Sequence, residues 1–185
     1  MKTERLKEAT KDLHQQVEEE NLARFIMDHS MDVETYKLLL LQNFLAYQKT
    51  ENAIAPFIKG YQGQKHKQLQ KDLEQLKISK FAPEFEFSCN SRAEAFGAAY
   101  VVEGSALGGM VLARNIKKCA GLSSIEKHHF FNGDKDSLKA WNDFKNELSQ
   151  QDFSEKEQEE ALEKAKDTFR FFREVFRMER TVLHS

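Results

Sequence analysis

Apolar residues recur at the spacing of an α-helix along most of the chain. Over residues 2–20 the apolar positions lie three or four residues apart, which places them on one helix face: Leu6, Ala9, Leu13 and Val17. Similar spacing predicts further helical segments over residues 22–27, 33–58 and 65–77. No stretch alternates apolar and polar residues over the length of a strand. The pattern therefore predicts an all-α fold of seven or eight helices.

Capping residues set the expected ends of these helices. Asp32 can cap the long third helix, and Asp136 can begin a helix near the C-terminal third of the chain. Ser91 and Ser154 each precede a glutamate by three residues, which is the capping-box pattern that opens a helix. The helix opened by Ser91 is expected to end at Gly121, after two lysines that suit its negative end.

The remaining segments complete the predicted organisation. The helix opened by Ser154 is expected to extend to about Leu183. Residues 80–90 contain a proline and are expected to form a loop. Because no repeat and no linker separates the segments, residues 1–185 are predicted to form a single domain.

An apolar stretch, residues 96–112, contains four of the eight glycines in the chain. Each glycine inside a helix costs about 1 kcal/mol relative to alanine, so this stretch is expected to bend or to lie against another group. Gly97, Gly104 and Gly108 are seven and four residues apart and are predicted to share one face, which Gly109 adjoins. That face offers bare backbone either to a neighbouring helix or to a flat ligand. The two consecutive glycines favour a bend beside a flat ligand.

Composition excludes several classes of protein. The net charge of −2 argues against a protein that binds nucleic acid through basic charge. No apolar run reaches about 18 residues and no secretory leader is visible, so neither a membrane span nor secretion is expected. The two isolated cysteines, Cys89 and Cys119, form no metal or redox motif and indicate a reducing compartment, the cytoplasm. The 15 phenylalanines suit an aromatic core, or a pocket for a flat ligand.

The first helix carries a candidate metal ligand, His14. It shares one flank of the helix with Lys7, Thr10 and Glu18, at offsets of three, four and seven residues. A histidine that binds a metal usually donates its other ring N–H to an oxygen, and Glu18 could accept that bond from Nδ1 and leave Nε2 for the metal. The alternative is a solvated histidine–glutamate pair on a polar flank.

The sequence resembles the bacterial heme oxygenase family over nearly its whole length. Residues 100–109, Tyr-Val-Val-Glu-Gly-Ser-Ala-Leu-Gly-Gly, are similar to the distal-helix motif Y-V-x-E-G-S/A-x-L-G-G of that family. Residues 6–18 resemble its proximal-helix segment, and Phe130-Phe131-x-Gly133 followed by Trp141-x-x-Phe144 also fits. The resemblance implies a multi-helical heme oxygenase-like bundle.

This resemblance implies a role for each matching residue. His14 would be the axial ligand of the heme iron and Glu18 its hydrogen-bond partner. Gly104, Gly108 and Gly109 would form the distal wall, and Ser105 would line the distal pocket near the bend. Four further residues would bind the heme propionates, as charge matching requires: Lys7, Tyr100, Arg170 and Arg173.

The implied activity is the oxidative opening of heme b, which is both cofactor and substrate. Heme, O2 and electrons would give biliverdin, carbon monoxide and ferrous iron. The electrons would come from an external reductase or ferredoxin, because the chain has neither a P-loop nor a G-x-G-x-x-G motif. No nucleic acid and no membrane is expected as a partner.

Three other readings of the sequence remain open. A heme carrier or sensor without turnover would share His14 and the propionate residues. A non-heme, di-metal member of the same helical superfamily would need paired Glu-x-x-His motifs, and only Glu126 to His129 has that spacing. His128 and His129 are interpreted instead as a polar surface pair, and Glu51 and Glu103 as buried carboxylates without a histidine three residues on. A purely structural bundle is the third alternative. No partner pattern accompanies three other histidines: His29, His66 and His184.

Overall fold

The computed structural model describes residues 1–78 and 83–179, and the regular secondary structure of these residues is helical throughout. The α-helices, with one short 3₁₀ helix η1 (Ala120–Leu122), are α1 (Thr3–Glu20), α2 (Arg24–Met27), α3 (Val33–Ile54), α4 (Lys65–Gln75), α5 (Arg92–Gly104), α6 (Ala106–Ile116), α7 (Asp136–Ser149) and α8 (Glu155–Phe176). The all-α class predicted from the apolar pattern is therefore confirmed.

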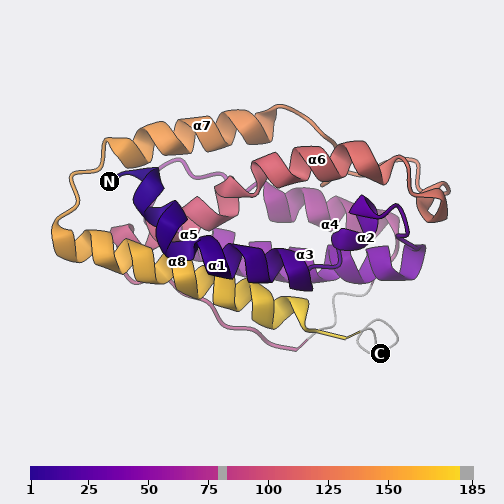
Figure 1. The fold of residues 1–185 in the computed structure, drawn as a ribbon, viewed down its shortest axis with the longest axis horizontal. Coiled ribbons are helices and arrows are strands. Elements are labelled where there is room, and N and C mark those ends of the chain that lie inside the picture. The colour runs from indigo at the N-terminus through magenta and orange to yellow at the C-terminus, as the bar shows by residue number, and fades with distance from the viewer. Residues whose placement is uncertain (79–82, 180–185) are drawn as a thin grey trace.

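Helices α3, α5 and α8 form the centre of the bundle (Figure 1). Helix α5 packs on α8, α3 and α7, while α1 lies along α8 and α4 packs on α3. Most residues of α3 are buried on every side of the helix, including the run Leu38 to Leu41, as expected of a core helix. Helix α6 contacts α2 and α7 and has little direct contact with α1.

Local capping chemistry explains where several helices begin. The Asp32 side chain accepts a hydrogen bond from the backbone N–H of Thr35 at 2.7 Å and so caps α3. Ser154 and Glu157 form a complete capping box at the start of α8. Ser91 caps α5 by accepting from the Glu94 N–H at 3.1 Å.

The capping box predicted at Ser91 is only half formed. The Glu94 carboxylate accepts a hydrogen bond from the backbone N–H of Asn90 at 2.8 Å, one residue before the capping serine. Its negative charge also meets the Lys164 ammonium of α8 at 3.2 Å. The glutamate therefore ties the start of α5 to α8 as well as to the preceding loop.

Several predicted helix ends are wrong. Helix α3 ends at Ile54, two residues before Pro56, because proline has no backbone N–H with which to continue the hydrogen-bond ladder. Helix α6 ends at Ile116, and Gly121 lies in η1, where a β carbon would come within 2.5 Å of the Met31 carbonyl oxygen. Helix α8 ends at Phe176, and Leu183 lies outside the described residues.

The glycine-rich stretch is one helical run with a break. Ser105 separates α5 from α6, and its hydroxyl donates to the Val102 carbonyl at 2.8 Å. The Gly109 N–H donates to the Ser105 carbonyl at 2.9 Å, so the hydrogen-bond ladder resumes directly after the break. The bend expected beside the consecutive glycines is thus present, four residues before Gly109.

Residues 92–116 form the one stretch within the described residues that is long and apolar enough for a membrane span. Its mean hydropathy is 1.4, and half of the apolar window is buried inside the bundle. Most of the buried residues of this stretch belong to α5, whereas α6 buries only Ala106, Ala113 and Ile116. Length and composition alone therefore do not show that this stretch spans a membrane. The stretch is nevertheless longer than the apolar run expected from the sequence.

Candidate heme site

His14 lies on an exposed part of α1. Its side chain is 58% exposed, and its Nε2 lies 3.5 Å from a carboxylate oxygen of Glu18, one turn further along the helix. The edge of the imidazole packs against the Phe169 ring of α8, with centroids 5.6 Å apart. The His14–Glu18 pairing expected from the spacing therefore exists, but through Nε2 rather than Nδ1.

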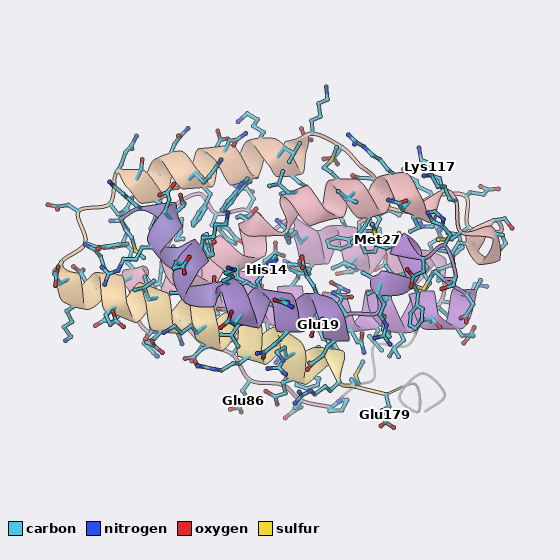
Figure 2. The ribbon with its side chains drawn as sticks, in the orientation of Figure 1. His14, Glu19, Met27, Glu86, Lys117 and Glu179 are labelled. Carbon is cyan, nitrogen blue, oxygen red and sulfur yellow. The ribbon has the colours of Figure 1, made fainter. Side chains whose placement is uncertain are left out.

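A polar contact between α1 and α5 lies close to His14. The Tyr100 hydroxyl lies beside the Thr10 side chain, one turn before His14. Both α1 and the α5–α6 run proceed from left to right in Figure 1. One turn beyond this contact the two helices therefore reach His14 and Gly104 respectively. Figure 2 places His14 between the ribbons of α1 and the α5–α6 run.

The four glycines of the stretch have three different environments. A β carbon on Gly97 would come within 2.0 Å of the Ala161 carbonyl oxygen, so this glycine permits the close contact of α5 with α8. A β carbon on Gly104 would lie 3.8 Å from the Trp141 indole of α7. Nothing lies within 4 Å of a β carbon placed on Gly108 or Gly109. The single glycine face predicted from the sequence is therefore interrupted at the bend, and the open space belongs to Gly108 and Gly109.

Ser105 lies at the bend, with its hydroxyl bonded to the Val102 carbonyl. The same hydroxyl lies beside that of Tyr47, a buried residue of α3. The Tyr47 ring packs against Phe130 and Phe172 at 5.5 and 5.2 Å. Burial raises the pKa of Tyr47, which keeps its hydroxyl protonated. Tyr47 could not be predicted from the sequence, because tyrosine in an apolar helix carries no local signal of a site.

Three large apolar side chains of the described residues are exposed, and they gather near the open glycines. Leu107 and Val111, one turn apart on α6, are 61% and 45% exposed, and Met27 of α2 is 45% exposed. Figure 2 shows Met27 between α2 and α6. Contiguous exposed apolar surface is typical of ligand and partner sites, whereas single exposed apolar side chains are common on any protein. These side chains were also missed, because exposure depends on how α6 packs.

The four residues expected to bind propionates lie in different surroundings. Lys7 is exposed on α1, and Tyr100 is half-buried beside Trp141. Arg173 of α8 holds the Glu20 carboxylate through two nitrogens, at 3.1 and 2.6 Å. Arg170 pairs with Asp167 at 2.6 Å and lines a surface cavity of about 670 Å³ between α3, α8 and residues 86–88.

Two buried carboxylates lie behind the bend. Glu103 is 7% exposed, and its carboxylate accepts from the Lys65 ammonium at 2.8 Å and from the Tyr61 hydroxyl at 2.9 Å. Glu51 is 2% exposed and pairs with the His66 imidazole at 2.5 Å. No partner for His66 was predicted from the sequence. The three contacts join residues 15, 38 and 42 positions apart, beyond the reach of helical spacing.

His29 and His128 have hydrogen-bonding partners, and both cysteines are buried. His29 Nε2 lies 2.9 Å from the Asn115 amide oxygen, and His184 lies outside the described residues. His128 is half-buried and its Nδ1 lies 2.7 Å from the Tyr36 hydroxyl, so the interpretation of His128 as a surface residue is wrong. Burial raises the pKa of the Cys89 thiol to about 11, as expected of an unreactive cysteine.

A non-heme metal centre has no ligand set in the part of the chain that the structure describes. Over residues 1–78 and 83–179 no group of three or more histidine, cysteine, aspartate or glutamate side chains is placed to hold a metal ion. The Glu-x-x-His sequence ending at His129 lies in a segment without helix, so it cannot project two ligands from one helix face.

Comparison with solved structures defines the class of this fold. It is similar to the fold of the heme oxygenase from Neisseria meningitidis in its NO- and CO-bound forms, with a TM-score of 0.74, 21% sequence identity, and coverage of 94% of this chain and 89% of that chain. Heme oxygenase-1 from the cyanobacterium Synechocystis sp. PCC6803 in complex with heme has a TM-score of 0.71 and 17% identity, with the same coverage of both chains. The bundle therefore has the heme oxygenase fold.

Sequence comparison gives the particular family. The heme oxygenase family profile matches residues 2–90 and 82–178, which together span almost the whole chain. The chain belongs to the heme oxygenase family, and it is a heme-degrading oxygenase. No curated protein sequence matches it significantly.

Proposed function

We propose that this oxygenase holds heme between α1 and α6, with His14 as the axial ligand of the iron, and opens the ring there. The proposal rests on one observation, which starts from the contact between Thr10 of α1 and Tyr100 of α5. Further along the two helical runs from this contact, α1 carries the exposed His14, and α6 carries the open backbone of Gly108 and Gly109. The metal ligand and the bare backbone come from segments about 90 residues apart in the chain, yet they belong to one region of the bundle.

The residues present fit a flat, apolar ligand that carries a metal ion. The space over Gly108 and Gly109 accepts a planar group close to the backbone, and Leu107, Val111 and Met27 offer apolar walls that solvent would otherwise cover. Bound heme supplies a redox-active iron and is itself the ring that is oxidised.

The protein's own groups orient the ligand and exclude water. Contact with Phe169 limits rotation of the His14 ring, and the Glu18 carboxylate can accept a hydrogen bond from the N–H of that ring. With Nε2 next to Glu18 in this structure, either the ring turns over on binding or Nδ1 is the liganding atom. The Ser105 and Tyr47 hydroxyls supply a fixed hydrogen-bonding group at the bend, close to where Gly104 and Gly108 would form the distal wall.

Carboxylate groups of the ligand need cations at the mouth of the site. Lys7, two turns before His14, is exposed and close enough in sequence to serve this role from α1. Tyr100 could donate a hydrogen bond to the ligand if its hydroxyl turned away from Thr10. Arg173 would have to leave Glu20, and Arg170 lies at the cavity with Asp167, so we assign the main role to Lys7.

The proposed products are biliverdin, carbon monoxide and ferrous iron, formed from heme and O2. Electrons would come from a separate reductase or ferredoxin. Both cysteines are free thiols, which supports a reducing compartment such as the cytoplasm as the place of the reaction.

Product analysis in air tests this function. The protein is loaded with one equivalent of hemin and supplied with ascorbate and catalase, so that free peroxide cannot attack the ring. We expect one biliverdin, identified by chromatography, and one carbon monoxide, trapped by ferrous myoglobin, for each heme consumed. A hemin complex that remains intact under these conditions would identify a carrier or sensor instead and contradict the proposal.

A further inference from the structure

A buried ion pair supports the helix bend from behind. The Lys65 ammonium and the Glu103 carboxylate are 2.8 Å apart, and their side chains are only 9% and 10% exposed. The Tyr61 hydroxyl donates to the second carboxylate oxygen of Glu103 at 2.9 Å. Each oxygen of the Glu103 carboxylate therefore accepts from one donor: Tyr61, which precedes α4, and Lys65, the first residue of α4.

Lys65 is itself held in place by a second buried carboxylate. The two oxygens of Glu51 accept from the backbone N–H groups of Lys65 and His66, at 3.0 and 2.9 Å. Glu51 belongs to the core helix α3, so the first turn of α4 is fixed to the centre of the bundle. The position of the Lys65 ammonium thus follows from the core and not from a flexible surface side chain.

The ion pair acts on the residues that form the proposed distal wall. Glu103 directly precedes Gly104 and Ser105, where the helical run breaks. Gly104 has no side chain to pack, and the Ser105 hydroxyl bonds only to the Val102 carbonyl among the hydrogen bonds of the described residues. The Glu103 side chain is therefore the nearest charged anchor of the bend, and Gly108 follows within five residues.

Stability alone does not explain a buried ion pair at this place. Removing two charges from water offsets most of their attraction, so an apolar pair of similar volume can stabilise a fold equally well. Such a pair does fix geometry, because only one arrangement satisfies both charges. A cavity of about 430 Å³, lined by Lys65, Glu103 and residues of α7, lies beside the pair and leaves the bend room to shift if the pair is lost.

We propose that Glu103 and Lys65 are positioning residues that hold the α5–α6 bend, and with it Gly104 to Gly109, at a fixed place over the heme. The inference rests on the proposed function of this site. In this proposal the Glu103–Lys65 pair controls the surroundings of the distal face of the heme. It thereby also controls which edge of the ring is oxidised. Neither residue touches the ligand in this account.

Two variants test the inference. Glu103→Gln keeps the shape of the side chain and its bond from Tyr61 but removes the charge, and Lys65→Met removes the other charge. The matched control is Glu94→Gln, which breaks the ion pair with Lys164 at the opposite end of the same helix. Each hemin complex is titrated optically with alkali in its ferric state, and its biliverdin isomers are separated after turnover.

We expect Glu103→Gln and Lys65→Met to shift the midpoint of the alkaline spectral transition by about half a pH unit or more. We also expect each to change the ratio of biliverdin isomers, while Glu94→Gln changes neither. If a single variant does not fold, Tyr61→Phe removes one donor to Glu103 but leaves the buried Lys65–Glu103 charges paired, and it should also shift the midpoint.

Two results would overturn the inference. In the first, the variants bind one hemin and keep the wild-type midpoint and isomer ratio. In the second, the control Glu94→Gln shows the same changes, which would make them a general effect of weakening α5. A wild-type protein that binds no hemin would overturn the proposed function as well, so failure of the site and failure of the positioning role are distinguishable.

Discussion

The environment of each glycine in the 97–109 stretch decides what a side chain there would do. At Gly97 a β carbon would meet the backbone of α8, whereas at Gly108 it would meet open space. A substitution at Gly108 therefore leaves the packing of the protein unchanged. Any effect of such a substitution must come from what occupies that space in function.

We predict that Gly108→Leu blocks turnover of heme without weakening the fold. The leucine would fill the space over α6 in which the ring and O2 are proposed to lie, so the rate of heme loss should fall about tenfold or more. The free energy of unfolding should not fall, and removal of a glycine from the helix should raise it by up to about 1 kcal/mol. Single-turnover absorbance and urea unfolding measure the two quantities.

The control for this variant is Arg114→Leu, which adds a leucine to an exposed position on the same helix. It should leave turnover unchanged. Normal heme loss in Gly108→Leu, or an equal loss of activity in both variants, would contradict the distal position of Gly108.

At the scale of elements, the contact between α5 and α8 depends on Gly97. A β carbon there would lie 2.0 Å from the Ala161 carbonyl oxygen, which is too close for any real contact. We predict that Gly97→Ala forces the helices apart and lowers the free energy of unfolding by about 2 kcal/mol or more, as overpacking does. Urea unfolding measures the change, and a loss below about 0.5 kcal/mol would show that the two helices adjust without strain.

The contact between α1 and α8 should depend on pH. Hydrogen bonds from Arg173, supported by Arg177, lower the pKa of Glu20 to about 2 from an ordinary value of 4.5. A group whose pKa is lower in the folded state stabilises the fold above its unfolded pKa, and this stabilisation is lost as the pH falls through the folded pKa. We therefore predict a loss of stability between about pH 4.5 and pH 2 to which this pair contributes.

The measurement compares wild type with Glu20→Gln by urea unfolding at several pH values in low salt. The difference in unfolding free energy between the two proteins should be largest above pH 4.5 and should shrink toward pH 2. A difference that stays constant over this range would mean that Glu20 is not stabilised as an anion by Arg173.

How well each element was predicted follows from the range of the interactions that define it. The starts of α3 and α8 were predicted because Asp32 and Ser154 cap groups only three residues away. The predicted end of α6 was wrong because Gly121 is required by its close contact with the Met31 backbone and does not terminate the helix. In a sequence, a glycine required for close packing cannot be told apart from one that ends a helix.

At the scale of the whole molecule, the proposed site combines segments from three parts of the chain. His14 comes from the first helix, Gly108 from the middle and Phe169 from the last helix. Helical spacing and the family motif were sufficient to propose His14 and the glycines. They could not place Arg170, whose position at the cavity with Asp167 depends on how α8 packs against α3. For the same reason Lys65 and Tyr47 were missed.

A ligand that joins these segments should stabilise the whole fold. We predict that hemin at a hundred times its dissociation constant raises the free energy of unfolding by about 2.7 kcal/mol, because it binds the folded chain alone. Thermal unfolding with and without hemin measures the shift in Tm. A Tm that does not depend on hemin concentration would mean that hemin binds no site assembled by folding.

The central claim is that His14 binds the heme iron beside the open side of α6, and optical titration with hemin tests it most directly. Wild type should give a saturable Soret band at one hemin per chain. His14→Ala should lose that band at the same hemin concentration and regain it when free imidazole is added, because the space that His14 vacates can accept the imidazole. A Soret band in His14→Ala that equals that of wild type in position, intensity and stoichiometry, without imidazole, would contradict the claim.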